Sequence, residues 1–234
     1  MRFLAPLALA VLLAGPLDGM ATAQNDATQA SPGEKVQIEE TFENGADRWK
    51  VTDANAWKIV EQNGNHVYAQ FQQSDYSPPH RSPLNIALLK DVVVGDFELT
   101  AKVQSTARDY PHRSVCLFFN YQDPAHFYYV HLGQAADDHA NQIFIVNDAL
   151  RTKISTKTTS GTPWDNQWHQ VKIVRDTASG KIEVYFDNME EPAMTAEDKS
   201  FTWGQIGLGS FDDTGNWDDV RLTGTRAAAP TSSE

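Results

Sequence analysis

The chain of 234 residues has a single cysteine, Cys116, and few basic residues. One cysteine excludes a disulfide framework, so packing or a metal has to stabilise the fold. Cys116 lies in the apolar run Val115–Phe119, which favours a buried small side chain over a nucleophile. The formal net charge is −12, with 19 Lys and Arg against 31 Asp and Glu. This balance argues against nucleic acid and against an anionic membrane as a partner.

Long hydrophobic runs and helical periodicity are lacking beyond the first 23 residues. Arg2 precedes the apolar stretch Phe3–Ala14, and Ala21-Thr22-Ala23 carries the small residues that signal peptidase recognises. The apolar stretch is too short to cross a bilayer as a helix. We therefore expect residues 1–23 to be a signal peptide that is cleaved near Ala23. The protein is then secreted or periplasmic, with no membrane insertion.

Apolar residues are also scarce on either side of the central region. Residues 24–35 and 226–234 are polar and rich in Ala, Ser and Thr, and we expect a disordered linker and a disordered tail. Residues 36–225 remain as one domain, which is long enough to bury a substantial core. The chain has neither an internal repeat nor a second linker, and we expect a monomer.

Short runs of β-branched and aromatic residues fill the central region, with turn residues such as Asn63-Gly64 and Ser179-Gly180 between them. Apolar and polar side chains alternate within 97–104, which is typical of an antiparallel strand with one wetted face. The pattern predicts an all-β fold, a two-sheet antiparallel β-sandwich. We expect strands at 36–42, 57–61, 65–71, 86–89, 97–104, 114–121, 127–132, 142–146, 169–175, 182–186, 205–210 and 217–223.

Three late segments, Trp168–Arg175, Ser179–Asn188 and Gly204–Ser210, carry motifs of the form W-H-x-V-x-x-x-R, G-x-I-x-V-Y-x-D and G-x-I-G-L. With the opening Phe42–Gly45 and the tryptophans that follow it, the chain resembles the concanavalin A-like lectin/glucanase (laminin-G-like) superfamily. The layout particularly resembles secreted 3-keto-disaccharide hydrolase and family 16-like domains. The resemblance implies a jelly roll that binds glycan on its concave sheet, within a polysaccharide-degrading system.

The segment from Asp109 to Arg151 holds four of the seven histidines and many aromatic residues. Strand alternation places Leu117, Phe119, Val130 and Leu132 in the core. It places Ser114, Phe118, Asn120, Tyr129 and His131 on the opposite face. Aromatic rings cover the apolar face of a sugar, while amides, imidazoles and guanidinium groups bond its hydroxyls. We expect the carbohydrate ligand to contact Asn120, Tyr129, His131, His139, Asn141, Asn147, Arg151 and Arg81. Burial of Tyr129 and His131 would refute that surface.

Two other functions stay open. As a glycan-cleaving lyase, the protein would use His131, Arg113, Tyr129 or Arg151 to neutralise a uronate and to take its proton. A glycosidase of the family 16 type is disfavoured because the E-x-D-x-x-E motif is absent. Glu183 and Asp187 share a strand face, but we expect this pair to be solvated. The third function is a laminin-G-like adhesion module that binds protein through its loops.

Metal binding is indicated only weakly. The histidines have no spacing diagnostic of zinc. The run from Asp212 to Asp219 is rich in oxygen donors that suit Ca²⁺. The alternative is a solvated turn between the last two strands, in which Asp side chains cap backbone N–H groups. The resemblance implies a structural Ca²⁺ that ties the first strand to the last, with Glu43 or Glu40 and Asp219 as ligands.

Overall fold

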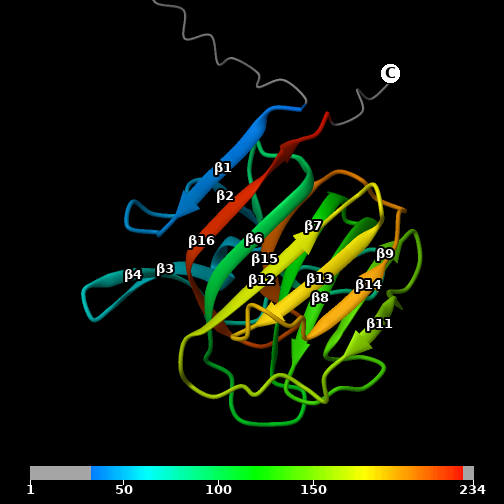
Figure 1. The fold of residues 1–234 in the computed structure, drawn as a ribbon. Coiled ribbons are helices and arrows are strands. Elements are labelled where there is room, and N and C mark those ends of the chain that lie inside the picture. The colour runs from blue at the N-terminus through cyan, green and yellow to red at the C-terminus, as the bar shows by residue number, and fades with distance from the viewer. Residues whose placement is uncertain (1–32, 229–234) are drawn as a thin grey trace, which may run out of the picture.

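The computed structural model describes residues 33–228, which form two antiparallel β-sheets packed face to face (Figure 1). The predicted two-sheet sandwich is thereby confirmed. The expected signal peptide and most of the two terminal segments lie outside the described residues. Within residues 33–228, no helix is long and apolar enough to cross a membrane.

The larger sheet has nine strands. They are β1 (Lys35–Glu40), β3 (Trp57–Gln62), β4 (Asn65–Gln70), β6 (Val94–Ser105), β11 (Ser155–Thr158), β12 (His169–Arg175), β13 (Lys181–Phe186), β14 (Met194–Glu197) and β16 (Gly215–Arg226). The order is β11-β14-β13-β12-β6-β16-β4-β3, and β1 also pairs with β16. Figure 1 shows β16, β6, β12 and β13 side by side, with β7 and β8 of the other sheet behind them. The pairing of β1 with β16 holds the two ends of the described chain together.

The smaller sheet has seven strands in the order β10-β9-β8-β7-β15-β5-β2. They are β2 (Trp49–Val51), β5 (Asn85–Leu89), β7 (Ser114–Asp123), β8 (His126–Gly133), β9 (Gln142–Asn147), β10 (Thr152–Lys153) and β15 (Gln205–Ser210). A single 3-10 turn, Ala54–Ala56, leads from β2 to β3. The segment 71–84 connects β4 to β5 and belongs to neither sheet.

The core lies between the sheets, where β6 of the larger sheet faces β7 and β8 of the smaller one. Leu117, Phe119, Val130 and Leu132 are fully buried there, as predicted. The seven-stranded sheet also carries a second apolar cluster on its outer face. We call this the outer cluster; its members are Ile86, Leu88, Cys116, Phe118, Tyr121, Phe127, Tyr129, Phe144 and Val146. Because both faces of β7 and β8 are covered, these strands read as nearly continuous apolar runs.

A β-bulge in β7 changes which side chains face the outer cluster. Asn120 has a φ of +43°, and the pairing of β7 with β8 shifts register between Phe119 and Asp123. The bulge reverses the alternation beyond Phe119. The expected outward position of Asn120 is therefore wrong. Its side chain points between the sheets and accepts a hydrogen bond from Nε of Arg175 (3.1 Å), while Tyr121 joins the outer cluster instead.

Candidate ligand-binding site

Two adjoining hollows open at the end of the seven-stranded sheet where β7 begins and β8 ends. One, of about 300 Å³, is lined by Arg81, His139, Leu150 and Arg151. The other, of about 260 Å³, shares three of these residues. We call the two together the arginine pocket. Its complete lining is Arg81, Tyr110, His112, Ser114, His131, His139, Leu150, Arg151, Phe211 and Asp212.

Arg151 is the most firmly held cation of the arginine pocket. It follows β9, and its guanidinium carbon lies 4.9 Å from the ring centroid of Phe144 and 4.7 Å from that of Phe211. Its Nη1 donates to the hydroxyl of Tyr129 (2.9 Å). This is the only hydrogen bond of the guanidinium within residues 33–228, and a guanidinium has five N–H donors. The group is therefore fixed in place with most of its donors available to a ligand.

Arg81 comes to the same pocket from the segment 71–84. Its side chain is exposed, and its guanidinium carbon lies 5.6 Å from the ring centroid of Phe211. Neither Arg81 nor Arg151 forms an ion pair with a carboxylate among the residues that the structure describes. Two cations thus meet at one aromatic ring, at the edge of a protein whose net charge is −12.

His131 forms the floor of the pocket. Its Nδ1 lies 2.8 Å from the carbonyl oxygen of His139, and its Nε2 lies 2.8 Å from Oγ of Ser114. Because a carbonyl only accepts, Nδ1 carries the proton and Nε2 accepts from the serine. Burial lowers the pKa of His131 to about 4, so the ring is neutral at pH 7. With 6% of its surface exposed, the residue supports the pocket from below.

A buried carboxyl lies beneath the floor. Asp213 accepts hydrogen bonds from the hydroxyl of Tyr110 (2.7 Å) and from the backbone N–H of Ser114 (2.8 Å). Burial raises the pKa of Asp213 above its ordinary value. Asp213 ties the loop before β7 to the turn after β15, and this arrangement positions Phe211 and Tyr110 at the pocket.

Several predicted ligand residues have other roles. Tyr129 is wholly buried in the outer cluster, so direct contact with a ligand is wrong; it acts through its bond to Arg151. Asn141 is also buried, donates to Oγ1 of Thr158 (3.0 Å) and accepts from Thr162 (2.8 Å). Asn147 is exposed but does not line the pocket. The open aromatic sheet expected from strand alternation is therefore replaced by a pocket at its end.

Arg113, a candidate for catalysis, lies between the sheets instead. It is 2% exposed and donates to Oγ and the carbonyl of Ser105 (both 2.9 Å), the carbonyl of Asp165 (2.6 Å) and Oδ1 of Asn166 (2.9 Å). The prediction of a substrate-facing Arg113 is wrong because this residue, which directly precedes β7, is buried and bonds Ser105 of β6. Its role is to join β6 and the segment before β12.

The residues expected to bind calcium have protein partners. Glu43 accepts from the backbone N–H of His66 (2.9 Å), and Asp219 pairs with Nζ of Lys102 (2.6 Å). Among residues 33–228, no group of three or more His, Cys, Asp or Glu side chains is arranged to hold a metal ion. Calcium binding by Glu43 and Asp219 stays a prediction.

A further depression lies at the opposite end of β7. It has a volume of about 390 Å³. Strand alternation gave no sign of it, because an unbroken alternation puts Tyr121 on the same side of the strand as Phe119. Tyr76 and Tyr121 line it together with Gln122 and Gln205. The segment 71–84 reaches both ends of the sheet, since it supplies Tyr76 here and Arg81 to the arginine pocket.

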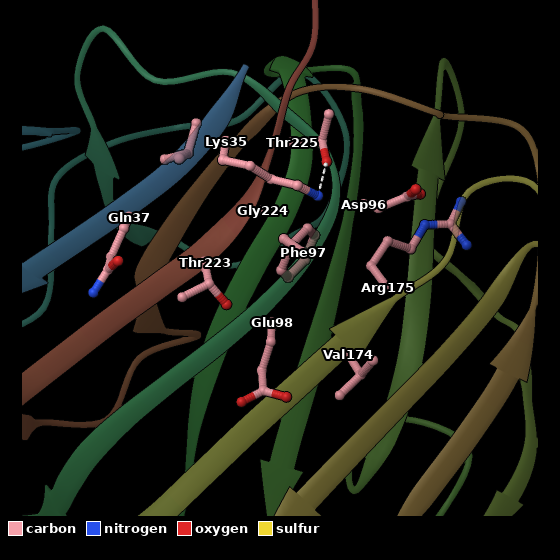
Figure 2. A pocket seen from close by; sticks show the side chains of 11 residues that line it. Lys35, Gln37, Asp96, Phe97, Glu98, Val174, Arg175, Thr223, Gly224 and Thr225 are labelled. Carbon is pink, nitrogen blue, oxygen red and sulfur yellow. Dashed lines mark hydrogen bonds between the residues drawn. The ribbon is translucent and has the colours of Figure 1, made fainter. Parts of the chain in front are cut away.

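The outer face of the nine-stranded sheet has a shallow depression of about 420 Å³ across β1, β16, β6 and β12 (Figure 2). Lys35 reaches across it to Oγ1 of Thr225 (3.3 Å). The aromatic ring that borders it, Phe97, is only 4% exposed. Because no aromatic ring is accessible on it, this surface provides less stacking area for a sugar ring than the arginine pocket does.

Comparison with known proteins defines the fold class. No protein-family model matches the chain, and no curated protein sequence matches it significantly. Three solved structures with similar folds cover most of it. The carbohydrate-binding module CBM66 from Bacillus subtilis has a TM-score of 0.53 and 16% identity, over 74% of this chain and 93% of that one. Lectin I from Ulex europaeus, complexed with a fucose glycoside, has a TM-score of 0.54 and 11% identity, over 81% of this chain and 97% of that one.

The third is winged bean acidic lectin complexed with methyl-α-D-galactose, with a TM-score of 0.51 and 12% identity, over 83% of this chain and 100% of that one. The chain thus has the β-sandwich fold seen in these two lectins and in this carbohydrate-binding module. At these identities the likeness establishes the fold and not the activity.

Proposed function

We propose that this protein binds glycans at the arginine pocket. The observation that carries the proposal is the convergence there of two guanidinium groups, several imidazoles and the ring of Phe211, on a sandwich of the lectin type. Guanidinium and imidazole N–H groups donate to sugar oxygens, while Phe211 and Leu150 supply apolar surface for the C–H face. Arg81, His131, His139 and Arg151, all predicted from the sequence, line this one pocket.

The small number of carboxyl groups at the arginine pocket favours glycan binding over glycan cleavage. A glycosidase needs two carboxyl groups that flank the scissile bond. Asp212 is the only carboxylate that lines the arginine pocket in the described part of the chain, because Asp213 lies beneath its floor. Tyr129, the candidate proton acceptor of a lyase, is buried, and burial raises the pKa of its hydroxyl far above the ordinary value. A binding module needs neither group.

The cellular setting of the proposal rests on the sequence. The signal peptide expected at residues 1–23 would export the protein. In that location a glycan-binding sandwich serves a polysaccharide-degrading system by holding material close to enzymes. The expected cleavage near Ala23 is checked by N-terminal sequencing of protein recovered from the culture medium or periplasm.

A glycan array followed by calorimetry tests the proposal. We expect at least one glycan to bind, and Arg81→Ala to weaken it by about 10-fold or more, since hydrogen bonds from a charged donor contribute about 1.5–3 kcal/mol. The matched control is Arg221→Ala, which removes an exposed arginine from the nine-stranded sheet and should leave the affinity unchanged. Equal binding by wild type and Arg81→Ala would place the ligand elsewhere.

A further inference from the structure

The charge of the arginine pocket restricts the kind of glycan that fits it. The hollow of about 300 Å³ is lined by two arginines, one histidine and one leucine, and by no carboxylate. The adjoining hollow contributes one acidic residue, the exposed Asp212, alongside His112 and His139. The side chains that line the first hollow are therefore cationic or apolar, whereas the protein as a whole is acidic.

Arg151 differs from the buried arginines because it is held in place while most of its N–H donors make no hydrogen bond within residues 33–228. Arg113 and Arg175 are buried and each donates to several protein acceptors, and Arg221 pairs with Glu39. Arg151 instead contacts two aromatic rings and one hydroxyl, none of which neutralises its charge. Arg81 brings a second positive charge to the same ring, Phe211, and the two like charges repel. An anion between them would relieve that repulsion.

From these contacts we propose that the glycan bound at the arginine pocket is anionic and places a carboxylate or sulfate group against Arg151 and Arg81. This inference rests on the proposed function and narrows its ligand class. A planar guanidinium donates two parallel N–H bonds to a carboxylate or to two sulfate oxygens, a geometry that an ammonium group does not reproduce. Leu150, which is 69% exposed, offers apolar surface beside the charged group for the C–H face of the sugar ring.

The net negative charge of the protein makes binding of an acidic glycan a specific test of the arginine pocket. A net charge of −12 repels polyanions, so nonspecific ion exchange does not favour the binding of an acidic glycan. Attraction has to come from a local site. The Arg221→Ala variant removes one positive charge, as Arg81→Gln does, but leaves the arginine pocket intact. Comparing the two variants separates the effect of the pocket on glycan affinity from the effect of the net charge.

Calorimetry with matched pairs of oligosaccharides tests the inference. One pair is an oligouronate and the same oligomer with its carboxyl groups reduced to alcohols; the other is a sulfated oligosaccharide and its desulfated form. We expect one charged member to bind at least 10-fold more tightly than its neutral counterpart, and the pair that shows the difference identifies carboxylate or sulfate. Arg151→Lys, which keeps the charge but loses the planar fork, should bind at least 5-fold more weakly, as should Arg81→Gln.

The contrary outcomes are distinct. If neutral and charged members bind equally well, the anionic specificity is wrong, while glycan binding at the pocket stands. If no glycan binds at all, the proposed function fails and the inference with it. If charged glycans bind and neither arginine variant weakens them, the arginine pocket is not their site. Thermal unfolding of Arg151→Lys and Arg81→Gln establishes that both variants are folded, and Arg81 is exposed, so its substitution leaves the core intact.

Discussion

Arg113 and Arg175 are both buried, and each donates hydrogen bonds to backbone and side-chain acceptors from several elements. We expect Arg113→Lys to lower the free energy of unfolding by about 2–4 kcal/mol, because an ammonium group cannot reach all four acceptors and leaves some of them buried and unpaired. Denaturation in urea measures this change. Glycan affinity should remain within about twofold of wild type.

A large loss of affinity with unchanged stability in Arg113→Lys would contradict that assignment. The result would return Arg113 to the residues that face a ligand, since the sequence proposed it as a candidate catalytic residue. Arg81→Ala is the converse variant. It should lose affinity with little change in stability, because surface substitutions away from packed groups are usually within about 0.5 kcal/mol.

His131 gives the protein a stability that depends on pH. Its folded-state pKa of about 4 lies below the ordinary value of 6.5, so the unfolded chain binds more protons between these two values. The free energy of unfolding should therefore fall as the pH decreases from about 6.5 to 4, by up to about 3 kcal/mol from this group. Urea denaturation of wild type and His131→Gln across this range measures the difference.

Direct titration provides the control for this prediction. The ring protons of His131, followed by NMR, should titrate with a midpoint near pH 4. A midpoint near pH 6.5 would contradict the buried neutral imidazole and the hydrogen bond that its Nε2 accepts from Ser114. Parallel stability curves for wild type and His131→Gln would contradict it as well.

At single positions, strand alternation predicted the inner residues of β7 and β8 correctly up to the bulge. It failed at Asn120 and Tyr121 because one residue with a left-handed backbone reverses every later position. Asparagine tolerates that conformation better than most residues, but no local pattern distinguishes it here from an ordinary strand residue. The burial of Tyr129 could not be predicted from its own strand either. The segment 71–84, whose Tyr76 packs against the outer cluster, is more than 40 residues away from Tyr129 in sequence.

Among the elements, β15 depends on close backbone approach. A Cβ atom added at Gly209 would lie 1.9 Å from the carbonyl oxygen of Asn85 in the neighbouring strand β5. We expect Gly209→Ala to lower the free energy of unfolding by about 3 kcal/mol or more, because neither backbone can move without breaking the ladder. Soluble expression and thermal unfolding measure the effect.

Gly45→Ala is the matched control for this strand. Gly45 also has a positive φ, of 94°, but no atom lies within 4 Å of an added Cβ. Its substitution should therefore show only the backbone penalty, about 1–2 kcal/mol. Equal destabilisation by the two variants would contradict the close approach of β15 to β5.

Every strand predicted from the sequence is present, and the four that were missed are β2, β10, β11 and β14. Each of these has two to four residues, so apolar alternation has too few positions to be visible. Three of them, β2, β10 and β11, lie at sheet edges, where one neighbour is absent. Their pairing is set by the rest of the sheet and not by their own residues.

For the whole molecule, the sandwich could be predicted because each of many short strands carries its own alternation of apolar and polar residues. The binding site does not follow in the same way. The arginine pocket is assembled by the segments before β7 and after β8, β9 and β15, together with the segment 71–84, and these meet only once the sheets have closed. Arg81, His139 and Arg151 were identified as rim residues by type, while Tyr110, Leu150 and Phe211 carried no signal.

The central claim is that a glycan binds at the arginine pocket, and the side-chain Nε–Hε resonances of arginine test it most directly. In an NMR titration with the glycan that binds most tightly, the signals of Arg81 and Arg151 should shift or broaden as the ligand is added. Those of Arg113 and Arg175, which are buried and bonded within the protein, should stay unchanged. Perturbations that spare Arg81 and Arg151 and gather instead around Tyr76 and Tyr121 would contradict the claim.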